Sequence, residues 1–319
     1  MKSTSFRRAL VPGIAALALA LSACGGDSGA EGADGDLSGT VSIDGSSTVA
    51  PLSEAAAELF RAENPNINIS VGTSGTGGGF EKFCKGETDI SDASRSIKDE
   101  EIAICEDAGI AFEELGVAND GLAVAVNPEN DWADCLTVDE VSSMWRAEGA
   151  VNNWSEVRDG FPDEPIEVFG PGSDSGTFDY FTEAINGEEG SIRKDYNDIG
   201  EDDNAAIQGV AGKKGATGYI PLSFINEAGG AVKAVEIEND QGDCVAPGLD
   251  TVQDGSYNPL GRQLYVYPSD TALEKPQVLA FLEFYIENQA SIAEAAGFIP
   301  LNSDQEQEAL DKLNSLLGE

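Results

Sequence analysis

The chain has no histidine among its 319 residues. This absence removes the usual general base of a Ser–His dyad or triad. Ser47 and Ser175, the serines that could act as nucleophiles of a hydrolase, also have no lysine close to them in the sequence. We therefore expect a protein that is not an enzyme and that uses no cofactor.

Basic residues are also scarce. The chain has 18 Lys and Arg against 58 Asp and Glu, a formal net charge of −40. Such a chain is a poor partner for nucleic acid, because affinity for the phosphate backbone comes from lysine and arginine. The same charge would repel any anionic ligand. An anion site in this chain must therefore depend on local dipoles and hydrogen bonds.

Cysteines are few, and their number favours disulfides. Of five, Cys24 lies near the N-terminus, which leaves Cys84, Cys105, Cys135 and Cys244. In an exported protein four cysteines allow three disulfide connectivities. We favour Cys84–Cys105, which closes a local loop, and Cys135–Cys244, which clips distant parts of one lobe. A metal site is disfavoured because the spacings are wide and histidine is missing.

The N-terminus has the pattern of an export signal. Basic residues at positions 2, 7 and 8 precede an apolar run, residues 9–21, that is too short for a comfortable membrane span. The motif Leu-Ser-Ala-Cys that ends at Cys24 resembles a bacterial lipobox, which implies cleavage of residues 1–23 and lipidation of Cys24. An ordinary secretory signal is the alternative. Residues 24–38 read as a flexible linker, so we expect a lipid-anchored protein on the extracytoplasmic face of the cell membrane.

Three short runs of Ser, Thr and Gly lie between a strand-like and a helix-like stretch. They are residues 44–52 (DGSSTVAPL), 72–80 (GTSGTGGGF) and 170–178 (GPGSDSGTF). A helix start presents unpaired N–H groups and a partial positive charge, so three of them could converge on one oxyanion. Simple helix capping is the alternative for each run. Three glycines at residues 77–79 are costly in a helix, and close approach of a ligand to the backbone would justify them.

Strands and helices alternate along the folded part. We predict strands around residues 41–43, 67–71, 121–126, 166–168, 218–222 and 263–267. Helices are predicted at residues 49–63, through 80–83, and at 177–185, 204–211, 277–290 and 304–317. This alternation indicates an α/β architecture with ligand loops at the carboxyl ends of strands.

The three loops, together with residues 87–98 (ETDISDASRSIK), resemble the phosphate-binding lipoproteins of high-affinity phosphate ABC importers, the PstS family. The resemblance implies a two-lobed periplasmic-binding-protein fold with a ligand cleft between the lobes and two hinge crossovers. It implies one lobe at residues 39–118 plus 262–319 and the other at 119–261, with hinges near 119–121 and 261–262.

Carried over by position, the resemblance assigns phosphate contacts to all three loops. In the first loop they are Thr48, the backbone of Val49 and the adjacent Ser47. In the second loop Thr76 matches best, with Ser74 as the alternative. The third loop contributes Ser175, Gly176 and Thr177.

Two positions depart from the family pattern. Pro171 stands where an arginine is frequent, and Ser94 stands where an aspartate receives the proton of phosphate. We expect Arg95 to supply the missing guanidinium, which can hold phosphate with two hydrogen bonds, unless it is only a surface residue paired with Asp99 or Glu100. The expected proton acceptor is Asp92, with three rivals at Asp44, Asp174 and Asp203. Such a carboxylate would favour protonated phosphate over sulfate.

The predicted function is capture of inorganic phosphate and its delivery to the permease subunits of an ABC transporter. We expect a monomer that closes over its ligand by a hinge motion. A membrane-tethered phosphate sensor, a binder of another tetrahedral oxyanion and a phosphoester hydrolase are the alternatives.

Overall fold

The structure is a computed structural model that describes residues 37–317, apart from positions 174 and 201. The predicted export signal, the predicted lipidation site at Cys24 and nearly all of the predicted linker lie outside these residues. Within the described part, no helix is both long and apolar enough to span a membrane.

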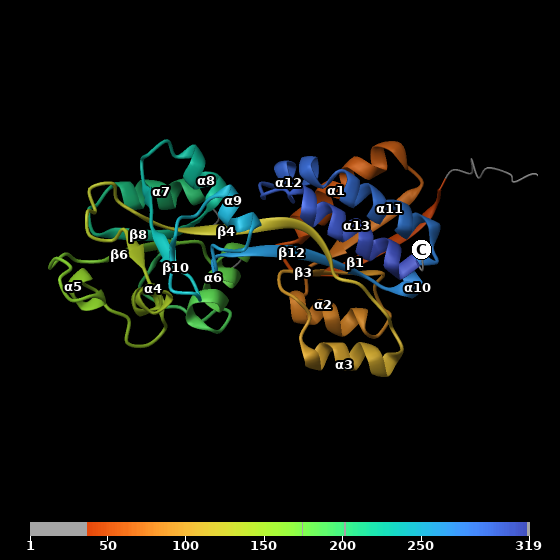
Figure 1. The fold of residues 1–319 in the computed structure, drawn as a ribbon, viewed down its shortest axis with the longest axis horizontal. Helices are drawn as coiled ribbons and strands as arrows, with labels where there is room; N and C mark the ends of the chain where they lie inside the picture. Colours follow the sequence, from red (N-terminus) through yellow and green to blue (C-terminus); the bar gives the residue numbers. More distant parts are fainter. Residues whose placement is uncertain (1–36, 174, 201, 318–319) are drawn as a thin grey trace, which may run out of the picture. The chain divides into compact units, whose positions relative to one another are not determined.

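One large mixed sheet runs through the described chain (Figure 1). Its strand order is β2-β1-β3-β12-β4-β8-β6-β7, with β9 paired to β4. The strands are β1 (Gly39–Gly45), β2 (Ile67–Gly72), β3 (Ile90–Ala93), β4 (Leu115–Val126), β6 (Glu167–Gly170), β7 (Asn197–Asp198), β8 (Ala216–Pro221), β9 (Lys233–Ala234) and β12 (Gly261–Pro268). A second sheet, in the order β11-β10-β5, joins β5 (Cys135–Leu136), β10 (Glu236–Glu238) and β11 (Cys244–Val245).

Helices cover both faces of the first lobe. The larger core packs β1, β2 and β12 against α1 (Ala50–Glu63), α11 (Pro276–Glu287), α12 (Gln289–Ala296) and α13 (Ser303–Leu317). A smaller core of Phe80, Phe83 and Tyr267 lies beneath α2 (Thr76–Phe83) and α3 (Asp99–Ala108), on the other side in Figure 1. The short α10 (Asp270–Leu273) follows β12 directly.

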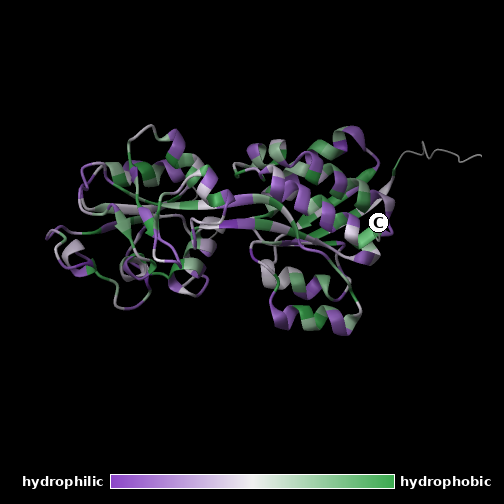
Figure 2. Cartoon of the chain, in the orientation of Figure 1, coloured by the Kyte–Doolittle hydropathy of each residue, from purple (hydrophilic) through white to green (hydrophobic). Residues whose placement is uncertain are grey.

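The second lobe has separate cores of its own. Trp145, Trp154, Phe181 and Tyr219 are buried in the larger one. Its helices are α4 (Val138–Trp145), α5 (Trp154–Val157), α6 (Gly176–Asn186), α7 (Asp203–Ala211), α8 (Leu222–Glu227) and α9 (Leu249–Gln253). In both lobes apolar residues gather along the strands and the inward sides of helices, and polar residues cover the outer helices (Figure 2). Two separately packed cores make a two-lobed body.

Two neighbouring strands carry the chain between the lobes. Every residue of β4 is buried; its first half pairs with β12, from Gly121–Gly261 to Leu115–Val266, and its second half pairs with β8. Figure 1 shows β4 and β12 side by side where they pass from one group of helices to the other. These are the two crossovers of the predicted fold. The residue boundaries predicted for the lobes stay a prediction.

The predicted elements are present, with one difference. The helix predicted at 277–290 is interrupted, since α11 ends at Glu287 and α12 begins at Gln289. Asn288 lies between them and its side-chain amide donates to the carbonyl of Phe284. An amide that bonds the preceding turn is a common end to a helix, and the apolar pattern alone did not reveal it.

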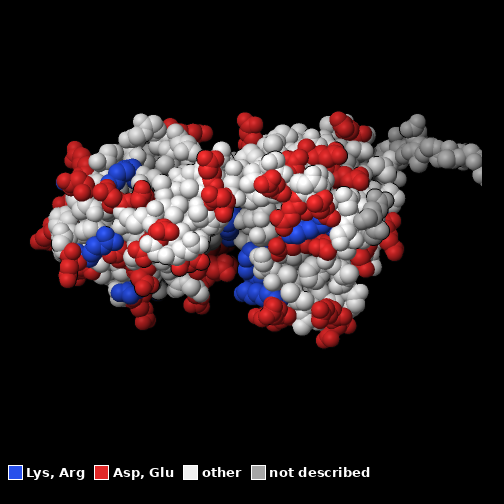
Figure 3. Space-filling view, viewed as in Figure 1, with Lys and Arg blue, Asp and Glu red and all other residues white. Residues whose placement is uncertain are grey.

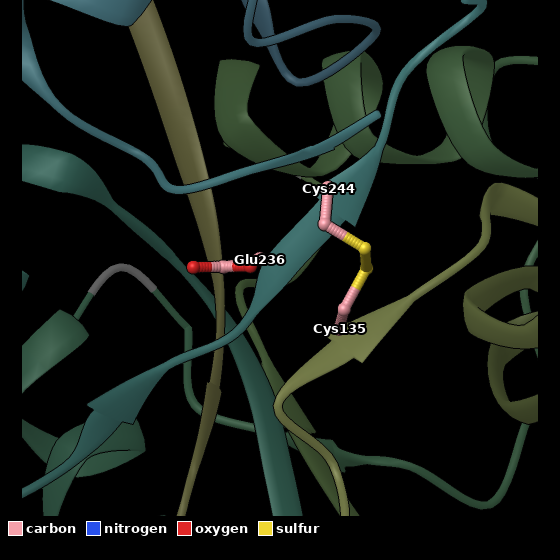
Figure 4. Close-up of side chains that lie close together, drawn as sticks. All are labelled: Cys135, Glu236 and Cys244. Atoms are coloured by element: carbon pink, nitrogen blue, oxygen red, sulfur yellow. A yellow bond between two sulfur atoms is a disulfide. The ribbon is translucent and has the colours of Figure 1, made fainter. Parts of the chain in front are cut away.

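Both predicted disulfide pairings are confirmed. Cys84–Cys105 links the end of α2 to α3, and Cys135–Cys244 links β5 to β11 across 109 residues. Figure 4 shows the second bridge with Glu236 beside it.

Candidate binding site

A cavity of about 320 Å³ opens between the two lobes. Its first-lobe side is lined by residues 46–48, residues 74–78, and Ser94, Arg95 and Lys98. Its second-lobe side is lined by Asp179, Tyr180, Glu183 and Glu189, and Arg262 of β12 lies between the two sides. The cavity therefore gathers the first and second predicted loops with the residues that follow β3.

Basic side chains concentrate at this cavity, although the chain as a whole is acidic. Arg95, Lys98 and Arg262 all line it. Figure 3 shows blue basic atoms gathered at the notch between the lobes, while red acidic patches and a few further blue ones are scattered over the otherwise white visible surface. The first-lobe side of the cavity and Arg262 therefore present positive charge to a ligand in a chain that is acidic as a whole.

The first loop joins β1 to α1 and forms part of the floor of the cavity. The Ser46 carbonyl accepts a hydrogen bond from the amide of Ala50 (3.0 Å), and its hydroxyl accepts one from the amide of Thr48 (3.2 Å). Ser47 and Thr48 line the cavity, and Val49 is fully buried directly behind them. These bonds fix the turn at the start of α1.

The second loop separates the two candidates that the sequence left open. The Ser74 hydroxyl and amide both donate to the carboxylate of Asp44, so Ser74 holds the loop in place. The hydroxyl of Thr76 lies 3.0 Å from that of Ser94. Thr76 and Ser94 thus form a hydroxyl pair on the wall of the cavity, which Ser74 also lines, and the choice of Thr76 over Ser74 as a ligand stays a prediction.

The glycine run has a structural reason that the sequence did not reveal. A Cβ on Gly79 would lie 2.5 Å from the Cα of Gly45, so this glycine lets α2 pack against the first loop. Gly77 and Gly78 do line the cavity. The explanation by close ligand approach is therefore wrong for Gly79, which does not line the cavity and is required by packing.

Arg95 reaches the cavity but is held by an acidic partner. Its guanidinium makes two hydrogen bonds of 2.8 Å to the carboxylate of Glu101, and its side chain is 23% exposed. These bonds raise the pKa of Arg95. The alternative partners considered from sequence, Asp99 and Glu100, are not the residues that bind it. Arg95 is both a cavity residue and one half of an ion pair.

The third loop begins α6, where the Ser175 hydroxyl accepts a hydrogen bond from the amide of Thr177 (3.2 Å). The described lining of the cavity does not include Ser175, Gly176 or Thr177. Gly176 contacts the first loop instead: the Thr48 hydroxyl lies 3.4 Å from its carbonyl oxygen. A Cβ on Gly176 would lie 2.7 Å from that hydroxyl. The third loop is thus next to the site, and its binding role stays a prediction.

Asp92 does not occupy the position that its predicted role requires. It is fully buried, it accepts a hydrogen bond from Ser53 (2.9 Å), and its second oxygen has no partner among the described residues. Burial, with a smaller effect of the Asp44 charge, raises the pKa of Asp92 to about 8. Because it lies behind the first loop and not on the cavity, a direct bond from Asp92 to a ligand is a poor fit to this structure.

The rival carboxylates do not replace it. Burial favours a higher pKa for Asp44, but hydrogen bonds from Lys82 and Ser74 lower it, and Asp44 lies behind the second loop. Asp203 is at the start of α7 and is not part of the cavity lining. Asp174 lies outside the described residues.

Several cavity residues are not among the site residues predicted from the sequence, and Arg262 and Asp179 are the two that matter most below. Arg262 lies at the predicted hinge, and its side chain is 13% exposed and lies over the ring of Tyr180, 3.4 Å from the centroid. Asp179 lies in the first turn of α6. Its position four residues after Ser175 is a signal that could have been used, because a residue in the first turn of a helix lies near the loop that starts it.

Arg262 connects both lobes and both crossovers. It donates to the carbonyl of Ser94 (3.0 Å) and lies 3.4 Å from the Thr48 hydroxyl and from the carboxylate of Asp120. Burial raises the pKa of Asp120 and the Arg262 charge opposes that rise. The 3.4 Å contacts are longer than usual for charged partners, so the guanidinium keeps donor capacity toward the cavity.

Among the described residues, one group has the ligand types and spacing of a metal site, namely Cys135, Glu236 and Cys244. Both of its sulfur atoms are in the disulfide shown in Figure 4. Because thiolates are the metal ligands, the oxidised pair leaves only the carboxylate of Glu236. The group is therefore a cross-link.

Comparison with known proteins gives consistent relatives. Residues 30–289 match the PBP superfamily domain. The protein SphX of Synechococcus elongatus is 44% identical over 82% of this chain and 77% of its own length. The phosphate-binding protein PstS of Staphylococcus saprophyticus is 37% identical over 94% of this chain and 92% of its own. A crystal structure of a protein from Planctomyces limnophilus, described as a possible phosphate binding protein, has a TM-score of 0.84 at 42% identity and covers 88% of this chain and 99% of its own.

Proposed function

Because the chain belongs to the PBP superfamily, in the family that contains PstS and SphX, we propose that it captures inorganic phosphate outside the cytoplasm and delivers it to the permease of an ABC transporter. The observation that carries the proposal is the cavity itself. It combines hydroxyls and helix starts with Arg95 and Arg262 in a chain that otherwise repels anions.

The proposed phosphate contacts follow from this lining. Ser47, Thr48 and the start of α1 form the floor, and Thr76 with Ser94 forms the wall. Arg262 supplies the buried positive charge. It takes the place of the arginine that is frequent in the family at the position of Pro171. The Thr48–Gly176 contact already joins the first loop to the start of α6, so Ser175, Gly176 and Thr177 would lie beside the ligand when the lobes are closed.

Closure requires a hinge, and the paired strands β4 and β12 are its proposed position. They are the connections that cross between the two cores, and Asp120 and Arg262 face each other there. Rotation at a few residues in such paired crossovers moves two rigid lobes without disturbing either core.

The proposal includes attachment to the membrane through Cys24. The basis is the lipobox-like motif, since this cysteine lies outside the described residues. A molecular mass of the cell-derived protein that fits residues 24–319 plus acyl chains would support it. A mass that fits a chain with an unmodified Cys24 would contradict it. Gel filtration at several concentrations tests the expected monomer.

Calorimetry on the purified protein tests phosphate binding directly. We expect saturable binding of phosphate at pH 7.5 and much weaker binding of sulfate. Absence of phosphate binding, or equal affinity for the two anions, would sink the proposal. Assays with phosphate esters test the hydrolase alternative, for which release of phosphate is required.

Transport and sensing differ in what deletion does to the cell. Transport predicts loss of high-affinity phosphate uptake, restored by the intact chain. A sensor that feeds no transporter predicts unchanged uptake with altered expression of phosphate-regulated genes.

A further inference from the structure

The second-lobe side of the cavity presents carboxylates to a site built for an anion. Asp179, Glu183 and Glu189 all line it. A carboxylate that faces an oxyanion is repulsive unless a proton lies between the two. Either the acidic side chains weaken binding, or at least one of them shares a proton with the ligand.

Asp179 is the acid best placed to share that proton. It lies in the first turn of α6, and the Ser47 hydroxyl of the first loop lies within hydrogen-bonding reach of its carboxylate. The same carboxylate senses the charge of Arg262. Asp179 therefore faces two of the groups that we assign to phosphate.

The other acids fit this role less well. Glu183 lies one turn farther along α6 and also lines a neighbouring hollow with Ser96 and Tyr265, away from the first loop. Glu189 lies beyond the end of the helix and is exposed. Asp92 is buried on the other side of the first loop, against Ser53.

Resting on the proposed function, we infer that Asp179 sets the protonation state of the anion that this protein accepts. When ionised, its carboxylate accepts a hydrogen bond from a protonated oxygen of phosphate. Sulfate carries no proton near neutral pH, so it meets Asp179 as an unpaired like charge. When protonated, Asp179 can donate to any oxyanion, and the discrimination weakens.

The surroundings of Asp179 place this change within an accessible pH range. Burial, then the charges of Glu189 and Glu183, raise the pKa of Asp179 to about 6, while Arg262 and Ser47 oppose the rise. Arg95 and Lys98 face it from the first lobe. Below pH 6 the carboxyl is mostly neutral and can donate, and above pH 7 it is mostly ionised and can only accept.

The test compares wild type, Asp179→Asn and Glu188→Gln by calorimetry with inorganic phosphate and with sulfate at pH 7.5 and 5.5. Glu188 is an exposed neighbour outside the cavity lining, so its substitution removes one local charge without touching the site. In the wild type and in Glu188→Gln we expect a preference for phosphate of about 100-fold or more at pH 7.5. In Asp179→Asn the amide donates to either anion, so the preference should fall below about tenfold.

The change in sulfate affinity with pH gives a second test of the role of Asp179. Sulfate affinity of the wild type and of Glu188→Gln should rise several-fold from pH 7.5 to 5.5, and that of Asp179→Asn should change less than about twofold. Melting curves verify that the variants fold. An unchanged preference in Asp179→Asn overturns this inference alone. A wild type that binds no phosphate overturns the proposed function as well.

Discussion

Arg95 and Arg262 both line the cavity, but the structure treats the two cations differently. Arg95, on the outer wall, is matched by two bonds of 2.8 Å to Glu101. Arg262, which lies beside Thr48 on the floor of the cavity, is more deeply buried; it bonds the neutral Ser94 carbonyl at 3.0 Å, and its contacts to Asp120 and Thr48 are 3.4 Å long. A cation whose charge is already matched can contribute less to an anion than one whose partners are loose. The comparison assigns the main role in phosphate binding to Arg262, on the floor of the cavity.

The largest effect on phosphate affinity is expected for Arg262, on the floor of the cavity. Arg262→Met keeps the apolar stem of the side chain and removes its charged guanidinium, so phosphate affinity should fall about 100-fold or more, which corresponds to about 3 kcal/mol. Isothermal calorimetry measures this loss. Retention of wild-type affinity would mean that the floor is not the anchor.

The Arg262 variant also leaves the buried carboxylate of Asp120 without its cation. Its folding is therefore checked by melting, and the double variant Arg262→Met with Asp120→Asn removes the unpaired charge. If the double variant recovers stability but not phosphate affinity, the loss comes from binding and not from misfolding.

The contribution to stability of Asp92, which supports the first loop from beneath, should depend on pH. Asp92 lies beneath the first loop and its backbone carbonyl accepts the amide of Ser46 (2.9 Å). Its pKa is about 8 in the fold against an ordinary value of 3.8, so unfolding releases a proton between these pH values. The contribution of Asp92 to stability is then full below pH 4 and is lost as pH rises through about 8, at a slope of up to about 1.4 kcal/mol per pH unit.

Asp92→Asn should remove this slope. Denaturant titrations at pH 5, 6.5 and 8 would show the difference in unfolding free energy between variant and wild type shifting in favour of the variant as pH rises. A parallel pH dependence of the two proteins would contradict the buried, neutral state of Asp92.

Two glycines of α2 differ in their surroundings, because Gly79 packs against the first loop and Gly77 lies near Arg95 and Glu101. Gly79→Ala forces a Cβ to within 2.5 Å of Gly45, so it should lower the unfolding free energy by about 1–3 kcal/mol and weaken phosphate binding. At Gly77 the nearest atoms, from Glu101 and Arg95, would be 3.8 Å or more away, so Gly77→Ala should leave stability unchanged or raised. Thermal melting of the two variants tests the contrast, and equal losses would contradict it.

The sequence predicted local and periodic features well. Apolar alternation predicted the strands β1 and β2, and the asparagine-proline pair at 64–65 predicted the end of α1. The two disulfide pairings followed from loop closure and were confirmed. These features depend on residues close together in the sequence or on a choice among few cysteine pairings. One sequence is enough to predict both.

The site was less predictable because it is built from long-range contacts. Arg262 lies in a strand more than 160 residues from Ser94, which it bonds, and no periodic pattern brings the two together. Asp92 and Asp179 are both aspartates beside a polar loop in the sequence. Only the fold buries the first behind α1 and turns the second toward the cavity.

The smallest effect on phosphate affinity is expected for Arg95, on the outer wall of the cavity, and measuring it tests the other half of the comparison. Arg95→Met should lower phosphate affinity only about tenfold, because Glu101 already matches most of its charge. Glu101→Gln weakens that ion pair and frees donors on Arg95. The amide oxygen of a glutamine can still accept from the amide of Lys98, the bond that caps α3.

Glu101→Gln should therefore raise phosphate affinity several-fold while α3 keeps its start. The double variant Arg95→Met with Glu101→Gln should show no such gain, since the freed guanidinium is missing. Calorimetry of the three variants forms a cycle that measures how far Glu101 restrains Arg95. A loss in Arg95→Met as large as that in Arg262→Met would mean that the Glu101 pair opens when the ligand binds, and that floor and wall share the anion equally.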